Sequence, residues 1–301
     1  MSKLTDRIKR AMSCEYWKIG YRKLREGKSL LQDEVIEGFT ILPGHRFVTQ
    51  ADPFVYKHQG KNYLFYEKQN LTDMKGTLWC FDLDDPGRKP VKVLEESCHL
   101  SYPQVFRYGK YTYMVPESKH TEEIRVYRCE RFPDQWELEN TLLNIPAVDT
   151  TILRTEEKGC LAFTYVDGRL QVYRCELDPG HFAPRKIELI YQGEESATVR
   201  PAGNLLYEDG KLLRPAQDCS EYYGQGLIFY EVSDPSSGNF EEREYKRFTP
   251  SQMSLIGCNP IGIHTYNRNE EYEVIDILHK EVGIAVLFKK LMWKLSQKED
   301  V

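Results

Sequence analysis

The sequence lacks several features that would assign the protein to a common class. Its 301 residues carry a formal net charge of −5, without the basic excess that a general nucleic-acid binder needs. The eight cysteines include no C-x-x-C pair, which argues against a zinc site, and the residues by themselves require no metal. No apolar run is long enough to span a bilayer, and no signal peptide is recognisable. We therefore expect a cytoplasmic protein with reduced thiols.

Helical periodicity is also missing between residues 50 and 280, where short runs of strand-forming residues recur instead. The stretch 51–67, ADPFVYKHQGKNYLFYE, predicts two strands joined by a turn at Gln59-Gly60. Related stretches follow at 102–117, 149–164, 200–218 and, more weakly, 262–276. Third- and fourth-strand candidates follow the first four copies. Four short strands per unit, at a period of roughly fifty residues, predict an all-β five-bladed β-propeller over residues 1–280.

The two ends of the chain have a different pattern. Residues 1–12 can form a short amphipathic helix, and the basic segment EYWKIGYRKL after them predicts an outer strand that closes the last blade. Residues 281–301 predict a C-terminal amphipathic helix, because Ile284, Leu287, Phe288 and Leu291 follow helical spacing. We expect this helix to pack on or beside the propeller. The alternative is that it lies on a membrane surface, which implies weak peripheral membrane contact.

The innermost strands of a propeller line a central channel, so their first residues should face one another at its mouth. These first residues are Asp52, Tyr102, Asp149, Arg200 and His264. The acids at the ends of three second strands should come near the same place: Glu67, Glu117 and Asp218. Each acid alone could be an inter-blade salt bridge or a turn cap. Together they predict glycosyl chemistry, in which one carboxylate activates a nucleophile and another protonates a leaving oxygen.

The blade starts ADPF, YPQVF and VDTTIL, with GIHTYN in blade five, resemble those of family 43 glycoside hydrolases. This resemblance implies that Asp52 is a general base and that Asp149 orients and tunes the acid. The general acid of that family is a glutamate that leads blade four, where this chain has Arg200, which cannot donate a proton at neutral pH. The proton donor would then be Glu117 or Asp218. The resemblance also implies a calcium ion near the axis, close to His264.

A second resemblance covers nearly the whole chain. The ordered series YWKIG, ADPF, HLSYPQVF, VPES, AVDTTIL, ATVRPAG, RPAQDCS and GIHTYN resembles the N-terminal propeller domain of plant glucosamine inositolphosphorylceramide transferases. Stand-alone bacterial relatives, which are linked to surface polysaccharide synthesis, resemble it too. The resemblance implies a carbohydrate-active protein. The transferase chemistry of the plant proteins, however, is attributed to a separate domain that this sequence does not contain.

Three functions remain open at this point: a glycosyl transferase or glycoside hydrolase, a non-catalytic glycan-binding module, and an interaction scaffold. We expect a glycan or sugar-phosphate ligand, no nucleic acid, and no required cofactor. The oligomeric state is not indicated. The candidate catalytic residues are Asp52, Asp149 and Glu117. The candidate substrate-binding residues are Arg200, Asp218, Tyr102, His264, Glu67 and His99, of which Arg200 would bind a phosphate or carboxylate.

Overall fold

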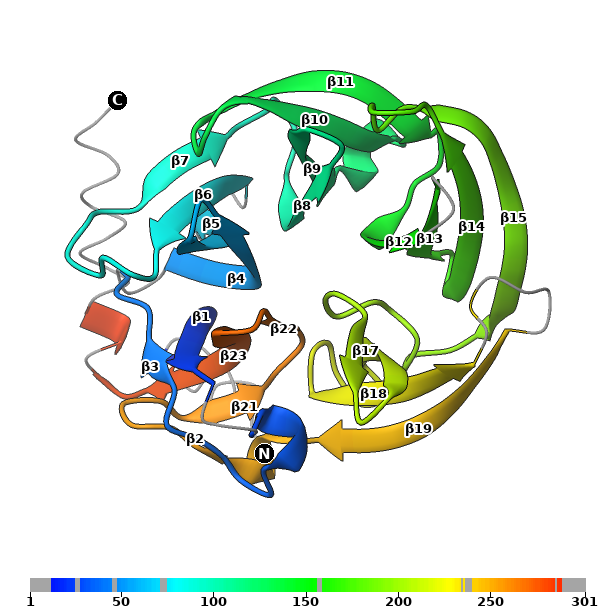
Figure 1. Cartoon of the computed structure of the whole chain (residues 1–301). Helices are drawn as coiled ribbons and strands as arrows, with labels where there is room; N and C mark the ends of the chain where they lie inside the picture. Colours follow the sequence, from blue (N-terminus) through cyan, green and yellow to red (C-terminus); the bar gives the residue numbers. More distant parts are fainter. Residues whose placement is uncertain are drawn as a thin grey trace.

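In the computed structural model, five antiparallel sheets surround a central axis (Figure 1). The prediction of an all-β five-bladed propeller is therefore confirmed. Within the described ranges, no helix is both long enough and apolar enough to cross a membrane. The structure describes residues 12–24, 28–44, 48–70, 75–155, 159–233, 235, 240–284 and 286–288.

The first four blades each contain four strands that run in chain order. Blade one consists of β4 (Val48–His58), β5 (Lys61–Asn70), β6 (Gly76–Asp82) and β7 (Val91–Leu94). Blade two consists of β8 (Ser101–Tyr108), β9 (Tyr111–Glu117), β10 (Ile124–Arg131) and β11 (Gln135–Leu143). Blade three consists of β12 (Val148–Thr155), β13 (Gly159–Val166), β14 (Arg169–Leu177) and β15 (Pro184–Glu195). Blade four consists of β16 (Leu206–Glu208), β17 (Lys211–Asp218), β18 (Gly226–Ser233) and β19 (Glu241–Phe248).

Blade five joins the two ends of the chain. The N-terminal strand β1 pairs along its whole length with β23, so it is the third strand of this blade, and β3 lies outside it. The strands of this sheet are β21 (Pro260–Gly262), β22 (Tyr266–Arg268), β23 (Tyr272–Val282), β1 (Ser13–Lys23) and β3 (Thr40–Ile41). The remaining elements are the parallel pair β2 (Ile36–Glu37) and β20 (Met253–Ser254), and the 3-10 turns η1 (Leu30–Gln32), η2 (Lys119–Thr121) and η3 (Pro250–Gln252).

The terminal helices are described only in part. The predicted helix over residues 1–12 lies outside the described residues except for its last position. A short C-terminal helix begins at Ile284, and residues 286–288 continue it. Val286 is buried against Cys14 and Tyr16 of β1, whereas Ile284 and Phe288 are each 65% exposed. The first turn of this helix therefore packs on blade five, and the rest of the predicted helix lies outside the described residues.

The apolar core is divided into clusters that lie between neighbouring blades. Phe65 and Leu78 of blade one, for example, pack with Val105 and Met114 of blade two. Strand residues alternate between the two faces of a sheet, so each blade presents an apolar face to both of its neighbours. Cys175 is fully buried in such a cluster, and Cys129 is half-buried beside another. Free cysteine is expected to fill such core positions.

A repeated irregularity shapes the start of the inner strands in blades one to three. Asp52, Tyr102 and Asp149 each adopt a positive φ, between 49° and 51°. The strand register shifts at each of these positions, which identifies them as β-bulges. Left-handed backbone is unfavourable for residues other than glycine and persists only where surrounding contacts hold it. Three equivalent bulges therefore lie at the same end of the axis, where they reorient the start of each inner strand.

The axis itself is closed by side chains below this end. The Tyr102 hydroxyl contacts the Thr151 hydroxyl at 2.8 Å and accepts a hydrogen bond from the Gly203 backbone N–H at 2.6 Å. Gln104 donates to the Asn204 side chain at 2.7 Å, which links blade two to blade four across the axis. The inner strands are thus tied together by buried hydrogen bonds, and the polar groups of the site form the upper end of this column.

Candidate active site

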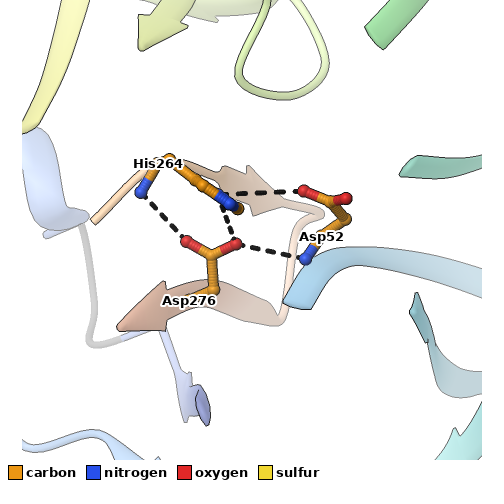
Figure 2. A group of neighbouring side chains, drawn as sticks. All are labelled: Asp52, His264 and Asp276. Carbon is orange, nitrogen blue, oxygen red and sulfur yellow. Dashed lines mark hydrogen bonds and ion pairs between the residues drawn. The ribbon is translucent and has the colours of Figure 1, made fainter. Parts of the chain in front are cut away.

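Two groups of side chains meet at the mouth of the axis. One lies between blades five and one and contains Asp52, His264 and Asp276 (Figure 2). The Asp276 carboxylate accepts hydrogen bonds from the backbone N–H groups of His264 and Asp52, and its Oδ2 lies 2.7 Å from His264 Nδ1. Because a carboxylate only accepts hydrogen bonds, this contact places the His264 proton on Nδ1. Asp276 therefore fixes both the ring of His264 and the backbone at Asp52.

The group in Figure 2 can be tested as a metal site, since its three side chains offer ligand atoms that all lie within 4.8 Å of one another. Asp276 is fully buried, and its oxygens already accept from three backbone N–H groups and from His264. A metal on His264 Nδ1 would have to displace the proton that faces Asp276. Calcium, moreover, prefers oxygen ligands. The donor set does not fit a metal in this arrangement, so no chemistry is assigned through one.

The second group lies between blades two, three and four. Arg200 forms an ion pair with Asp149 through Nε and lies 3.7 Å from Glu117 Oε2. Gln217 donates to the same Asp149 oxygen at 2.7 Å, and the Asp149 backbone N–H donates to Glu117 at 3.2 Å. The other Asp149 oxygen, Oδ1, is buried and has no hydrogen-bond partner within the described residues. A buried acceptor without a partner is costly and is typical of functional sites.

Glu67 and His99 lie beside these groups. His99 Nδ1 accepts a hydrogen bond from the Gly76 backbone N–H, and its Nε2 lies 3.4 Å from Glu67 Oε1. Glu67 is almost fully buried, whereas a quarter of the His99 side chain is exposed. The contact orients His99 at the rim of the cluster.

Three carboxyl groups at this end of the axis, those of Asp52, Glu67 and Glu117, have raised pKa values. Burial raises the pKa of Asp52 to about 7, although the neighbouring His264 opposes the shift. Burial and the nearby Asp52 and Glu117 raise the pKa of Glu67 well above its ordinary value. Burial and Asp149 do the same for the pKa of Glu117, against the effect of Arg200. Burial alone would lower the pKa of His264, but the Asp276 and Asp52 carboxylates outweigh it and raise this pKa.

Aromatic rings cover part of the cluster. The Trp17 ring lies 3.7 Å from that of His264, between centroids, and the Tyr223 ring lies 5.3 Å from it. The Arg200 guanidinium lies 5.2 Å from the centroid of Tyr223, so this ring spans both groups of the site. Asp149 is only 1% exposed, whereas the side chains of Arg200 and Glu117 are 24% and 12% exposed. Solvent therefore reaches the cluster mainly over Arg200 and Glu117.

The structure thus brings together most of the residues that the sequence indicates: Asp52, Glu67, His99, Glu117, Asp149, Arg200 and His264. Tyr102 differs from the prediction in that it is fully buried and crosses the axis below the mouth. It donates its backbone N–H to Asp52 at 3.2 Å. The contacts of Tyr102 are those of a support for the cluster.

Asp218 lies elsewhere. Its carboxylate binds Ser220 and pairs with Arg247 on β19, the outermost strand of its blade. The neighbouring Gln217 faces Asp149 instead. The difference arises in the turns, because glycine takes the first turn position in blade two, at Gly109, and the second in blade four, at Gly210. Counted from the second turn position, Gln217 is the equivalent of Glu67 and Glu117. Adjacent strand residues face opposite ways, so this one-residue offset turns Asp218 outward.

Other site residues carry no strong signal in the sequence. Asp276 ends the weakest repeat. The position of the turn glycine in blade four makes Asp218, and not Gln217, match Glu117 in the sequence. Trp17 reaches the site because β1 closes blade five, and Tyr223 because the loop between β17 and β18 folds over the axis. Neither ring could be assigned to the site before the arrangement of the blades was known.

These observations define a five-bladed propeller with a buried acid cluster at one end of its axis. Solved structures with this fold include the catalytic domain of a Coprinopsis cinerea GH62 α-L-arabinofuranosidase, with 13% identity and a TM-score of 0.57 over 76% of this chain and 90% of that one. They also include a Xanthomonas citri GH43_1 enzyme complexed with xylotriose, with 10% identity and a TM-score of 0.57 over 80% of this chain and 88% of that one. At these identities the similarity shows the fold alone.

The chain belongs to the family described as glucosamine inositolphosphorylceramide transferase 1, N-terminal, whose model matches residues 43–256. It is 33% identical over 204 residues to the transferase of that name from Arabidopsis thaliana. The aligned residues cover 64% of this chain and 27% of the relative. A rice relative of the same name, from Oryza sativa subsp. japonica, is 31% identical over 202 residues with the same coverage. The predicted family resemblance is confirmed. The chain spans about a quarter of the length of these curated relatives.

Proposed function

We propose that the chain is a carbohydrate-active enzyme that transfers or hydrolyses a glycosyl unit at the axial acid cluster. The substrate would belong to surface polysaccharide or glycolipid metabolism. The single observation that carries this proposal is the surplus of buried carboxyl groups over cations at one end of the axis. Burying a carboxylate without a cationic partner is unfavourable, so such a surplus suggests a functional role. Raised pKa values in a cluster are typical of catalytic sites. Relatives named as transferases and a fold shared with glycoside hydrolases support the class.

Glu117 is the proton donor in this proposal. Its pKa lies well above the ordinary value, which favours the protonated carboxyl group, and its side chain is in part exposed. As the bond from the anomeric carbon to the leaving oxygen breaks, Glu117 would pass its proton to that oxygen. Asp52, with a pKa of about 7, would take the proton of the attacking hydroxyl or water as the new bond forms. The net transfer moves one proton from acceptor to leaving group.

Arg200 and Asp149 position the substrate in this account. Asp149 is hidden behind Arg200, accepts a hydrogen bond from Gln217, and holds the guanidinium in place through its ion pair. The exposed part of Arg200 can bind a phosphate or carboxylate of the substrate, which a planar guanidinium does well. On the blade-five side of the cluster, the His264 ring is fixed by Asp276 and contacts the Asp52 carboxyl group.

The decisive experiment offers the purified protein a panel of glycosides and sugar phosphates and measures the release or transfer of sugar. We expect Glu117→Gln to lower turnover by roughly a hundredfold or more, since positioned acids contribute about this much. Glu95→Gln, a change to an exposed acid of blade one, is the matched control and should keep full activity. Equal turnover in Glu117→Gln and wild type would remove Glu117 from the mechanism.

A second function, a non-catalytic glycan-binding module, is favoured by one specific observation. Arg200 stands where the resemblance to family 43 hydrolases expects the general acid, and it is engaged by both Asp149 and Glu117. In that case the acids would accept hydrogen bonds from sugar hydroxyls. Arg200→Lys separates the possibilities for this residue, because a point charge cannot reproduce the guanidinium fork. Unchanged affinity for every anionic glycan would mean that Arg200 only holds Asp149.

The cytoplasmic location and the weak peripheral membrane contact are also proposals. The exposed Ile284 and Phe288 at the start of the C-terminal helix support membrane contact. Sedimentation with anionic vesicles at low salt tests it, with Phe288→Ser as the variant that should pellet less. Pelleting at background level for the wild type would contradict the proposal.

A further inference from the structure

A cleft lies at the end of the propeller opposite the acid cluster. The inner strand β4 runs from Asp52 at the mouth to His58 at the far end, where the turn to β5 begins. A cleft of about 500 Å³ opens there between blades one and two. It is lined by the β4–β5, β8–β9 and β10–β11 turns and by the loop between β6 and β7. Its volume falls in the range of cavities that hold small ligands.

Aromatic side chains form one wall of this cleft. The ring of His58 stacks on that of Phe132, with 3.9 Å between centroids and an angle of 10° between planes. Tyr63 meets the same Phe132 ring edge-on at 4.8 Å. Because Phe132 belongs to blade two and the other two rings to blade one, the stack fixes the two blades at the cleft. Partly exposed rings held in this way can pack against the apolar face of a sugar.

The charges of the cleft are unbalanced. Its two acids already have cationic partners, since Asp82 lies 3.6 Å from Lys61 and Glu130 lies 2.7 Å from Arg128. The lining cations differ: three exposed side chains form no ion pair with any carboxylate in the described part of the chain. These are Arg88, Lys89 and Lys110.

These cations come from both sides of the cleft. Arg88 and Lys89 belong to the β6–β7 loop of blade one, and Lys110 belongs to the β8–β9 turn of blade two. The Lys110 ammonium lies 4.9 Å from the Tyr111 ring centroid, which holds it beside the aromatic wall. Exposed cations on both sides of one cavity raise the local concentration of anions.

We propose that this cleft binds an acidic segment of a glycan, with a sugar ring against the aromatic wall and its carboxylate or phosphate between the cations. The proposal rests on the proposed function for the class of ligand, but it requires no turnover. It assigns to the chain a second carbohydrate site, separated from the acid cluster by the length of the inner strands. Such a site would hold an acidic polymer while the axial cluster acts elsewhere on it.

Calorimetric titration of the full chain tests the proposal with three probes: trigalacturonic acid, glucose 6-phosphate and the neutral cellotriose. We expect at least one acidic probe to bind and cellotriose to bind much more weakly. Lys89→Ala and Lys110→Ala should each weaken binding of the acidic probe by roughly tenfold, the worth of one charge-assisted hydrogen bond. Lys57→Ala is the matched control, because Lys57 lies on β4 but pairs with Glu271 at 2.6 Å outside the cleft.

Several results would overturn the proposal. Neither acidic probe binding the wild type would do so, and so would equal binding of cellotriose. Competition by inorganic phosphate at the same affinity would reduce the cleft to a simple anion site. Binding that is lost in Arg200→Lys but kept in Lys89→Ala would place the ligand at the axial cluster instead. Unchanged turnover in Glu117→Gln, with binding at the cleft intact, would count against the proposed function alone.

Discussion

One end of the propeller holds more acids than cations, and the other end holds more cations than acids. At the mouth of the axis the acids are buried and outnumber the cations Arg200 and His264. At the far end, in the cleft between blades one and two, Arg88, Lys89 and Lys110 are exposed and form no ion pair within the described parts of the chain. Exposed charges stay ionised at little cost, whereas buried carboxyl groups take up protons instead. This difference is the basis for the proton chemistry that we propose at one end and the anion binding that we propose at the other.

Asp276 is the residue whose replacement should have the largest effect on stability. We expect Asp276→Asn to lower the free energy of unfolding by about 3–5 kcal/mol, because an amide cannot accept all the hydrogen bonds that the carboxylate accepts and leaves His264 without its counter-charge. Chemical denaturation measures the change. Asp134→Asn, in an exposed pair with Arg131, is the control and should change stability by less than about 0.5 kcal/mol. Similar values for the two variants would mean that burial does not distinguish the two kinds of acid.

The pH dependence of stability tests the raised pKa of Asp52. In the folded state the pKa of Asp52 is about 7, above the ordinary value of 3.8, so the folded protein binds this proton more tightly than the unfolded chain. The resulting stability is complete below the ordinary pKa and is lost as pH rises through 7. The melting temperature of the wild type should therefore fall between pH 5 and pH 8 more steeply than that of Asp52→Asn. Parallel curves for the two proteins would contradict the raised pKa.

Tyr102 tests the support beneath the cluster. Tyr102→Phe keeps the ring but removes the hydroxyl that contacts Thr151 and accepts from Gly203. We expect a loss of about 1–3 kcal/mol in unfolding free energy, since the Gly203 N–H would be buried without a partner. Tyr207→Phe, at a ring that is 69% exposed, is the control. If Tyr102→Phe is as stable as this control, the axis is not held by the Tyr102 hydroxyl.

The smallest effect belongs to the far cleft. Replacing both Arg88 and Lys89 by Gln should change the free energy of unfolding by less than about 0.5 kcal/mol, because neither side chain forms an ion pair with any residue that the structure describes. Denaturation under the conditions used for Asp276→Asn makes the two ends directly comparable. A large destabilisation would show that these cations stabilise the fold and are not available to a ligand.

The repeats at 51–67, 102–117, 149–164, 200–218 and 262–276 were enough to predict the five blades, because strand period and turn residues are local properties of the sequence. They also indicated which residues lead each inner strand. They could not show that Gln217 rather than Asp218 faces the axis, since one shifted turn glycine reverses the face of a strand. Nor could they place Trp17 or Tyr223, whose positions depend on closure of blade five and on a loop fold.

Turnover by Asp52→Asn is the decisive test of the glycosyl chemistry that we propose for the axial acids. Asparagine keeps the size of the side chain and removes its ability to take a proton. We expect wild type to release or transfer sugar from at least one glycan or sugar phosphate. Asp52→Asn should do so roughly a hundredfold more slowly while remaining folded. Wild type that binds glycans without turnover, and Asp52→Asn that binds them equally well, would contradict the claim and establish a binding module.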